Sequence, residues 1–327
     1  MPIRRASIQS LAKINLDLRV LHQRPDGFHE LRTVFQTISL ADTIDIEYEP
    51  SRRTAVSIDD PLAIPGNLVV QAAHAVLAAL KIRARVKLRL RKQIPMGGGL
   101  GGGSSNAAAV LLALPVLIGR PLAAEQIAAE LGSDVPFFLN GGAAVGIGRG
   151  TEVYEIQDLK PDPILVVSSG LHVATGPAYQ ALGRSLTAND SSSKINEFQA
   201  FVRVLASGHS AEAASPFSTN DFEAIVFRQF PQLQTIARKL SQSGIGRARP
   251  GVRMTGSGSA IFAIFGSRAE RDRVEAVLKG DRVFRRYLVM PAALVNRRSY
   301  QQLWRRQLRQ HIRTDQSLWP LQSRYAK

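Results

Sequence analysis

The chain has 327 residues, of which 45% are hydrophobic and 21% charged, a composition typical of a globular protein long enough for two domains. It contains no cysteine, which excludes disulfides, thiolate nucleophiles and thiolate metal ligands. The net charge of +16 suits nucleic acid, a membrane surface or a phosphorylated small molecule alike, so charge alone does not choose the partner.

The N-terminal segment is predicted to form strands. Apolar and polar residues alternate within residues 6–21, and Pro25 and Gly27 mark a turn after this strand. Two further strand-like segments, 31–40 and 42–49, follow as antiparallel neighbours. The N-terminus carries two arginines but no continuous apolar stretch or cleavage site, so we expect no secretory signal and a cytoplasmic protein.

Helices and strands alternate in the next segment. Asn67 is placed to cap a helix, and residues 85–95 alternate between apolar and basic side chains, as a half-exposed strand does. A second helix is expected to begin at a cap formed by Ser104 or Ser105. Its apolar run, 107–119, contains a proline and is shorter than the roughly 20 residues that span a bilayer, so no transmembrane helix is predicted.

The second half of the chain contains further elements. Residues 141–156 and 162–169 are strand-like, whereas the polar segment 186–199 predicts a loop. Helices then lead to a second glycine cluster at 254–267. We place a domain boundary near residue 155.

The C-terminal residues, 298–327, hold six arginines and one lysine against one aspartate. Tyr300, Trp304, Leu308 and Ile312 recur at a spacing of four and face away from several arginines, which predicts a basic amphipathic helix. Packing on the core or on a partner subunit is one interpretation of this helix. Contact with a membrane surface or RNA is the other.

Residues 94–108, IPMGGGLGGGSSNAA, hold six glycines in seven positions. A flexible linker is one interpretation. The position between a strand and a helix favours another, a loop whose bare N–H groups bind phosphate at the positive end of the helix. It is not a Walker A loop, because Ser104 occupies the lysine position. Gly97, Gly99 and Gly102 match the dinucleotide pattern, but the basic strand before them opposes that interpretation.

Three motifs resemble those of the GHMP kinases, a family of small-molecule kinases: AKINL (12–16), PMGGGLGGGSSNAA (95–108) and TGSGSAIFAIF (255–265). RPDGFHEL (24–31) and GSDVPFF (132–138) are similar to segments of family members whose substrate is a cytidine diphosphate-linked alcohol. The resemblance covers about residues 6–295 and implies an ATP-dependent kinase with an alcohol acceptor.

The same resemblance implies an α+β fold with two domains. Residues 1–155 would form an ATP-binding domain like domain 2 of ribosomal protein S5, and residues 156–297 a ferredoxin-like domain. Residues 298–327 then form a basic C-terminal extension, which departs from the family pattern.

Phosphoryl transfer to an alcohol requires neutralised phosphates, an in-line hydroxyl and a base for its proton. The loop lacks its own lysine, and the resemblance implies that Lys13 supplies the cation, orients the hydroxyl and lies beside Asp134. It implies that Asp134 is the general base.

The implied binding residues fall into two sets. Those for ATP are Asn67 and the loop residues Pro95, Met96, Gly97, Gly98, Gly99, Leu100, Gly101, Gly102, Gly103, Ser104 and Ser105. Those for the substrate are Asn15 on its alcohol part, His29 on cytosine, Phe28 and Tyr179 as aromatic walls, Thr175 on the diphosphate, and Gly256 and Gly258 in the third motif.

ATP is used as its Mg²⁺ complex, so we expect Mg²⁺, with protein ligands that the sequence does not identify. The core is expected to bind small molecules rather than nucleic acid, as a monomer or homodimer. Two alternatives remain: another GHMP kinase of the mevalonate or homoserine type, which RPDGFHEL disfavours, and a basic nucleic-acid-binding protein on the same fold. Intact Lys13, Asp134 and glycine loop disfavour the second.

Overall fold

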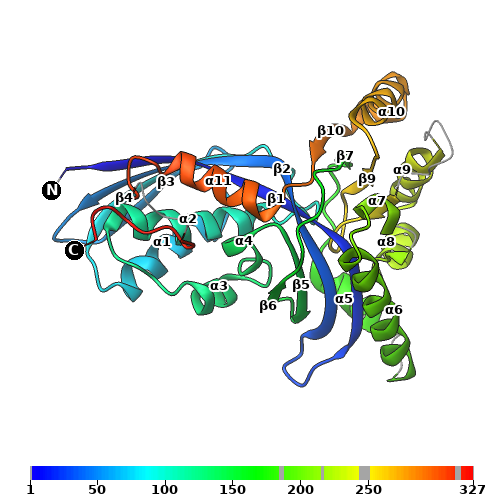
Figure 1. The fold of residues 1–327 in the computed structure, drawn as a ribbon, viewed down its shortest axis with the longest axis horizontal. Helices are drawn as coiled ribbons and strands as arrows, with labels where there is room; N and C mark the ends of the chain where they lie inside the picture. Colours follow the sequence, from blue (N-terminus) through cyan, green and yellow to red (C-terminus); the bar gives the residue numbers. More distant parts are fainter. Residues whose placement is uncertain (1, 184–187, 215–216, 243–250, 314–317, 327) are drawn as a thin grey trace.

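The protein is described by a computed structural model that covers residues 2–183, 188–214, 217–242, 251–313 and 318–326 (Figure 1). A long antiparallel hairpin, β1 (Arg4–Gln23) and β2 (His29–Pro50), runs through the centre of the molecule. The two segments expected at 31–40 and 42–49 are one strand of 22 residues. The pairing of β1 with β2 shifts register at three places, and such shifts let the hairpin bend. The chain therefore continues as one bent strand where two separate strands were expected.

The N-terminal sheet is mixed and has six strands. Besides β1 and β2 it contains β3 (Ala55–Asp59), β4 (Ala84–Arg91), β5 (Ala143–Gly148) and β6 (Glu152–Glu155). The predicted alternation in β4 is confirmed, because every second residue is buried. Its outward Lys87, Arg89 and Arg91 each pair with an aspartate or glutamate of β2 or β3, so this basic strand carries little unbalanced charge.

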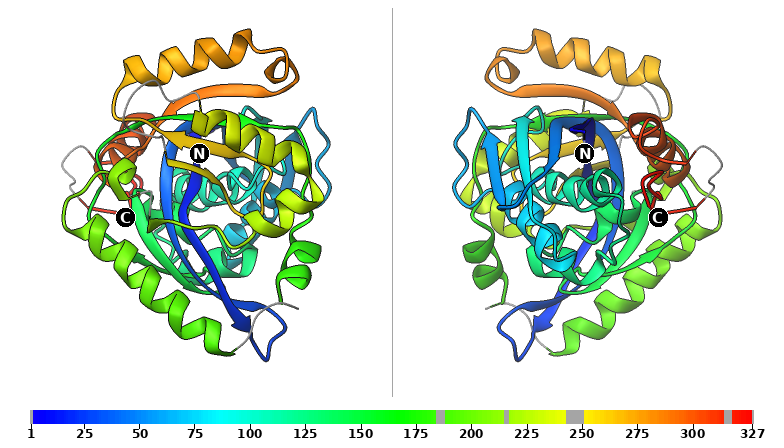
Figure 2. Two further views of the ribbon diagram at one scale, coloured as in Figure 1. Left: turned by 90° about the vertical axis from the view of Figure 1, so that its right-hand side faces the viewer. Right: turned by 90° about the vertical axis from the view of Figure 1, so that its left-hand side faces the viewer.

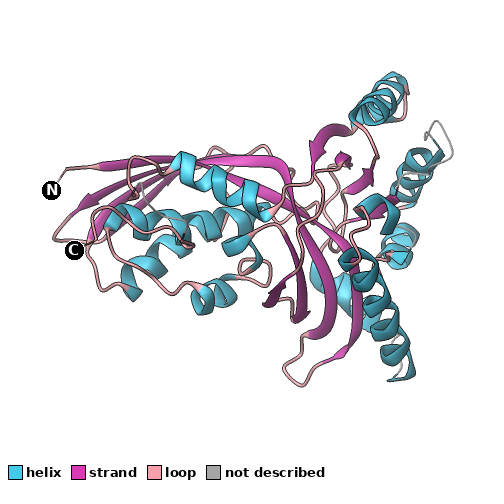
Figure 3. Ribbon diagram, in the orientation of Figure 1, coloured by secondary structure: helices cyan, strands magenta, loops and turns pink. Residues whose placement is uncertain are grey.

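Four helices pack on one side of this sheet (Figure 3): α1 (Leu68–Ala79), α2 (Gly102–Ile118), α3 (Glu125–Leu131) and α4 (Phe137–Asn140). The Asn67 cap is confirmed, since its side chain accepts the Val69 N–H. The serine cap is wrong. Helix α2 begins after Gly101, and Ser105 lies one turn inside, where its hydroxyl donates to the Leu11 carbonyl. Among the residues that the structure describes, no side chain caps the first N–H groups of α2.

The C-terminal sheet contains β7 (Pro163–Ser168), β8 (Gly251–Met254), β9 (Ile261–Ile264) and β10 (Leu288–Ala293), in the order β10-β7-β9-β8. Helix α10 (Arg268–Gly280) lies outside β10 (Figure 2). The other elements of this half are α5 (Thr175–Gly183), α7 (Ala211–Ala214), α8 (Glu223–Gln229), α9 (Pro231–Gln242) and the 3-10 turn η2 (Phe284–Arg286). Strand order and connectivity confirm the expected ferredoxin-like arrangement in the two-domain α+β fold.

The loop expected at 186–199 is wrong for the residues that the structure describes. Helix α6 (Ala188–Ala206) occupies this segment, whereas 186–187 lie outside the described residues. The first turns of α6 are polar, so the sequence there shows no helical pattern of apolar residues. Its buried apolar residues, Phe198, Phe201 and Leu205, lie in the second half of the helix and pack in the core beside β1. Ser and Asn favour loops only where tertiary contacts do not override them.

The C-terminal residues return to the N-terminal half of the molecule (Figure 1). Helix α11 (Arg297–Gln307) contacts β1 and α4 and buries Tyr300 and Trp304, and Leu308 follows them into the N-terminal core. The amphipathic helix is confirmed for 297–307, and its apolar face is used within the chain, whereas Leu308 and Ile312, which were expected on the same face, lie beyond the last residue of the helix. In the described ranges, no helix is long and apolar enough to cross a membrane.

Replacing Trp304 by alanine should destabilise the fold by about 3–5 kcal/mol, because a fully buried indole is removed from the N-terminal core. Thermal or urea unfolding measures this loss. Arg306→Ala on the exposed face of the same helix is the control and should change stability by less than about 0.5 kcal/mol. Equal stability of Trp304→Ala and the wild type would contradict the packing of α11 on this core.

Candidate active site

Two cavities meet at the glycine loop. The larger, about 900 Å³, lies between the tip of the β1–β2 hairpin and α5. The smaller, about 380 Å³, is lined by the glycine run and by the residues before α1. Gly99, Gly101 and Ser104 line both cavities, so a group bound in one can reach a group bound in the other at this point.

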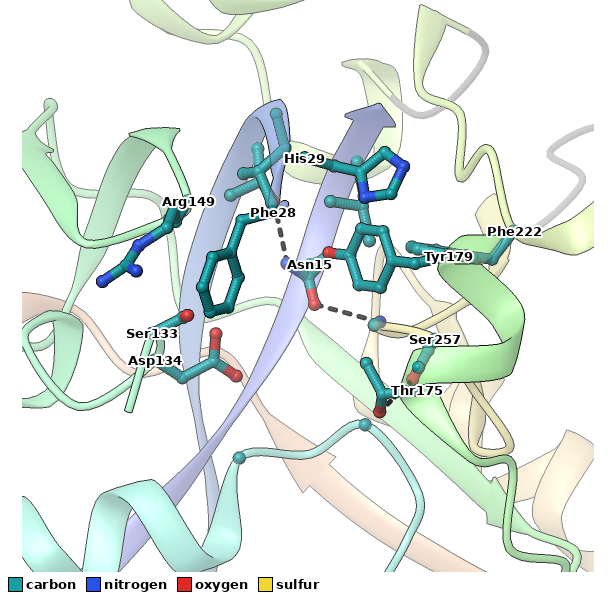
Figure 4. Close-up of a pocket in the computed structure, with 18 of the residues that line it drawn as sticks. Asn15, Phe28, His29, Ser133, Asp134, Arg149, Thr175, Tyr179, Phe222 and Ser257 are labelled. Carbon is teal, nitrogen blue, oxygen red and sulfur yellow. Dashed lines mark hydrogen bonds between the residues drawn. The ribbon is translucent and has the colours of Figure 1, made fainter. Parts of the chain in front are cut away.

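Lys13 and Asp134 both line the larger cavity beside this junction. Figure 4 shows the Asp134 side chain there. Lys13 comes from β1, only 3% of its side chain is exposed, and its Nζ is 3.1 Å from Oδ2 of Asp134. Asp134, in the turn before α4, is 31% exposed and faces the larger cavity. The structure therefore brings the two predicted catalytic residues together, with the ammonium buried and the carboxylate accessible.

Asn15 is buried beside Lys13 and is tied into a network. Its Oδ1 accepts hydrogen bonds from Lys13 Nζ at 2.7 Å and from the Gly256 N–H at 3.0 Å, and its Nδ2 donates to Thr33 Oγ1. Its backbone N–H donates to the hydroxyl of Thr255. Asn15 thus joins β1 to the turn between β8 and β9. It also lines the larger cavity, where its predicted substrate contact stays a prediction.

The first three glycines face the C-terminal half of the molecule. The carbonyls of Gly97 and Gly98 accept the N–H groups of Ser259 and Ala260. A Cβ on Gly99, which has φ +73°, would lie 2.1 Å from the Thr255 carbonyl oxygen. These glycines let the loop dock on the turn between β8 and β9.

The second three glycines face Lys13 and the start of α2. A Cβ on Gly101 would lie 2.9 Å from Lys13 Cγ and 2.9 Å from the Phe138 ring. A Cβ on Gly102 would lie 2.9 Å from Lys92 Nζ. A Cβ on Gly103 would meet only Leu68, at 3.9 Å, so the space beside this residue at the positive end of the helix is open.

The other residues predicted for ATP lie in different surroundings. Pro95, Met96 and Asn67 line the smaller cavity, and Leu100 is a buried member of its wall whose carbonyl accepts the Lys13 N–H. Ser105 is buried and does not line either cavity, because its hydroxyl points back to Leu11.

Aromatic side chains form the far end of the larger cavity (Figure 4). The rings of His29 and Tyr179 stack with centroids 5.0 Å apart, and Phe222 supports Tyr179 edge-on. Burial lowers the pKa of His29, with a smaller contribution from His22. Burial raises the pKa of Tyr179, and nearby Asp134 adds to this shift. At neutral pH the stack is therefore formed by a neutral imidazole and a neutral phenol.

The opposite wall of the larger cavity is formed by Phe28, whose side chain is half exposed.

The C-terminal half contributes hydroxyl groups to this cavity. Thr175, at the start of α5, lies with its Oγ1 3.1 Å from the Ser257 Oγ, and Gly256 is next to them. Gly258 is not among the lining residues, and a Cβ there would lie 2.8 Å from the Met254 sulfur. The structure thus brings Thr175 and Gly256 to the cavity and keeps Gly258 apart.

Sequence reasoning missed several residues of the two cavities. Arg149 lies over the Phe28 ring, with Cζ 4.4 Å from its centroid. Lys92 lines the smaller cavity and pairs with buried Asp42, whose other oxygen accepts the N–H groups of Gln93 and Ile94 before the loop. Lys92 stands just before the glycine run and could have been found there, whereas the position of Arg149 follows only from the tertiary fold.

The glycine run lines the smaller cavity, aromatic side chains line the larger one, and the Lys13–Asp134 pair lies where the two meet. This site, on a fold with two sheets of the strand orders given above, defines a kinase of small molecules. Residues 67–142 match the family GHMP kinases N terminal domain, and residues 202–281 match GHMP kinases C terminal. The chain belongs to the GHMP kinase family and, within it, to the group of the 4-diphosphocytidyl-2-C-methyl-D-erythritol kinases. It is an ATP-dependent phosphotransferase.

Relatives of this group resemble the chain along most of its length. The 4-diphosphocytidyl-2-C-methyl-D-erythritol kinase of Solibacter usitatus is 49% identical over 98% of both chains, and that of Gloeobacter violaceus is 36% identical over 84% of this chain and 90% of its own. A crystal structure of 4-(cytidine 5'-diphospho)-2C-methyl-D-erythritol kinase has a TM-score of 0.70 at 33% identity and covers 88% of this chain and 98% of its own. Homoserine kinase from Cytophaga hutchinsonii, at 15% identity, shares the fold with a TM-score of 0.67, covering 90% and 96%.

Gly99→Ala should lower kcat/KM for ATP at least about tenfold, because the new Cβ meets the Thr255 carbonyl and the left-handed backbone adds strain of about 1–3 kcal/mol. Steady-state kinetics with varied ATP measures this effect. Gly280→Ala, at the last residue of α10, is the control, because a Cβ there would meet nothing within 4 Å and the residue lies outside both cavities. If both variants lose the same activity, docking of the loop on the C-terminal half does not explain the first three glycines.

Proposed function

We propose that this chain transfers the γ-phosphoryl group of ATP to the 2-hydroxyl of 4-diphosphocytidyl-2-C-methyl-D-erythritol, a step of the non-mevalonate synthesis of isoprenoid precursors. The observation that carries the proposal is the position of Lys13 and Asp134 where the smaller cavity, lined by the glycine run, meets the larger cavity. The names of the relatives supply the substrate.

The proposed chemistry is direct transfer. The carboxylate of Asp134 accepts the proton of the substrate hydroxyl while that oxygen forms a bond to the γ-phosphorus. The bond from phosphorus to the bridging oxygen breaks, and its electrons leave with ADP. Lys13 holds its ammonium between Asp134 and Asn15, where it orients the attacking hydroxyl and offsets the negative charge of the phosphates.

The phosphates are proposed to bind at the uncapped N-terminus of α2, on the N–H groups of Gly101, Gly102 and Gly103. Mg²⁺ bound with ATP supplies further charge neutralisation. Ser104 lines both cavities, and its hydroxyl would serve as a ligand of this ion. The described residues contain no group of three His, Asp or Glu side chains that could hold a metal, so nucleotide and water would supply most of its ligands.

The cytidine is proposed to bind between the two aromatic walls. A planar base stacks on the Tyr179 and Phe28 rings, and the neutral His29 offers hydrogen bonds to cytosine. Thr175 and the Gly256 turn face the diphosphate. We further infer a cytoplasmic enzyme that works as a monomer or homodimer.

The substrate assignment is tested by ADP release from purified protein with Mg²⁺-ATP and three acceptors. We expect rapid turnover of 4-diphosphocytidyl-2-C-methyl-D-erythritol and little of mevalonate or homoserine, because only the first substrate carries a base for the aromatic walls. Equal rates with all three acceptors, or none with the first, would refute the assignment. Turnover of mevalonate or homoserine alone would identify another kind of GHMP kinase.

Asp134→Asn should lower kcat by about 10²–10⁴-fold while ATP still binds, because the amide cannot accept the hydroxyl proton. Rapid-quench or coupled kinetics measures kcat, and titration with a fluorescent ATP analogue measures binding. Asp59→Asn is a matched control, since Asp59 is also ion-paired but lies on the exposed face of β3. Near wild-type turnover of Asp134→Asn would show that another group is the base.

A further inference from the structure

The C-terminal extension, residues 298–327, contacts α4, the short helix that follows the turn holding Asp134. Helix α4 has four residues, too few to be stable alone, and its last carbonyls have no partner within the helix. Tyr300 Oη donates a hydrogen bond to the Phe138 carbonyl. Trp319 Nε1 lies 2.9 Å from the Leu139 carbonyl and 3.0 Å from Asn140 Oδ1. The extension thus supplies the donors for the Phe138 and Leu139 carbonyls of α4.

The other end of this helix is continuous with the candidate catalytic turn. Val135 N–H donates to the Gly132 carbonyl at 3.1 Å, and Phe138 N–H donates to the Val135 carbonyl at 3.1 Å, so Asp134 lies in the first of two successive turns. Rotation or translation of α4 would therefore move the Asp134 carboxylate relative to Lys13.

Helix α4 also touches the surroundings of Lys13. A Cβ on Gly101 would meet both the Phe138 ring and the Lys13 side chain, so these two side chains lie on the same side of Gly101. The ring of Phe137 packs on Phe35 with centroids 5.0 Å apart, and Phe35 lies 5.5 Å from Lys13 Nζ. One short helix therefore fixes both members of the pair.

The contact between the extension and α4 is close and specific. Gly141, directly after α4, has φ +64°, and a Cβ there would lie 2.5 Å from the Tyr300 ring. Only glycine leaves room for this approach. Tyr300 is buried, and burial raises the pKa of its phenol, which keeps the donor protonated.

We propose that Tyr300 and Trp319 are positioning residues for phosphoryl transfer, which hold α4 and through it Asp134. This inference rests on the proposed role of Asp134. It gives the basic extension a function within the kinase, while Arg298 and Arg306 of α11 are exposed on the outer face of this helix.

The test compares three full-length variants with the wild type, using the acceptor that the wild type phosphorylates. Tyr300→Phe and Trp319→Phe remove the two donors and keep most of the packing. Trp304→Phe is the control, because the Trp304 ring contacts both aromatic donors but makes no hydrogen bond to α4 among the described residues. The measurements are kcat, KM for both substrates, the stoichiometry of ATP-analogue binding and the melting temperature, with all assays well below melting.

We expect each of the first two variants to lower kcat about tenfold or more per binding site, because small displacements of a reacting group have large effects on rate. KM for ATP should stay within about twofold, since the glycine loop is not altered. Trp304→Phe should lose stability without losing kcat. A kcat that follows melting temperature in all three variants, or full kcat in both donor variants, would overturn the proposal. If the wild type does not phosphorylate the cytidine alcohol, the proposed substrate fails, whereas the comparison of the variants still tests the positioning.

Discussion

The buried charge of Lys13 is the constraint on which this site depends. An ammonium taken out of water requires oxygen partners at fixed places, because an unpaired buried charge is costly. Asp134 and Asn15 supply those oxygens, one from the turn before α4 and one from β1 itself. The stem of Lys13 passes Gly101, where no side chain blocks it. One charge thereby fixes a strand, the glycine loop and the acidic turn relative to each other.

The glycine run performs two tasks that look alike in the sequence. Gly97, Gly98 and Gly99 allow the loop to dock on the β8–β9 turn, through backbone contacts with the C-terminal half. Gly101 and Gly102 leave room for two lysine side chains at the start of α2, and Gly103 borders open space. The interface between the halves of the molecule and the nucleotide cleft are therefore adjacent parts of one loop, which explains why the run is longer than a phosphate site alone requires.

The sequence predicted which residues of the first hairpin are extended, although not that 29–50 form one strand. It also predicted the Asn67 cap, β4 and the amphipathic α11, because each has a local period or a local cap. The meeting of Lys13 with Asp134 was predicted only through motif resemblance, since nothing local relates these distant residues. The failures have a tertiary cause. Helix α6 is polar where it begins and is stabilised by packing beside β1. The Ser105 hydroxyl of α2 donates to a carbonyl of β1, and Arg149 lies over the Phe28 ring. Local sequence does not encode such contacts.

The β1–β2 hairpin has a consequence for biosynthesis. The hairpin can form from local sequence, yet Leu18 exchanges backbone hydrogen bonds with Thr219 and Asp221, and His311 Nε2 lies 2.8 Å from the Arg5 carbonyl. A ribosome makes the chain from its N-terminus, so β1 is complete before the residues of the C-terminal half that bond to it have been synthesised. A nascent chain released early would keep strand edges and apolar faces uncovered. The N-terminal strand therefore completes its contacts only after residues near the C-terminus have been made.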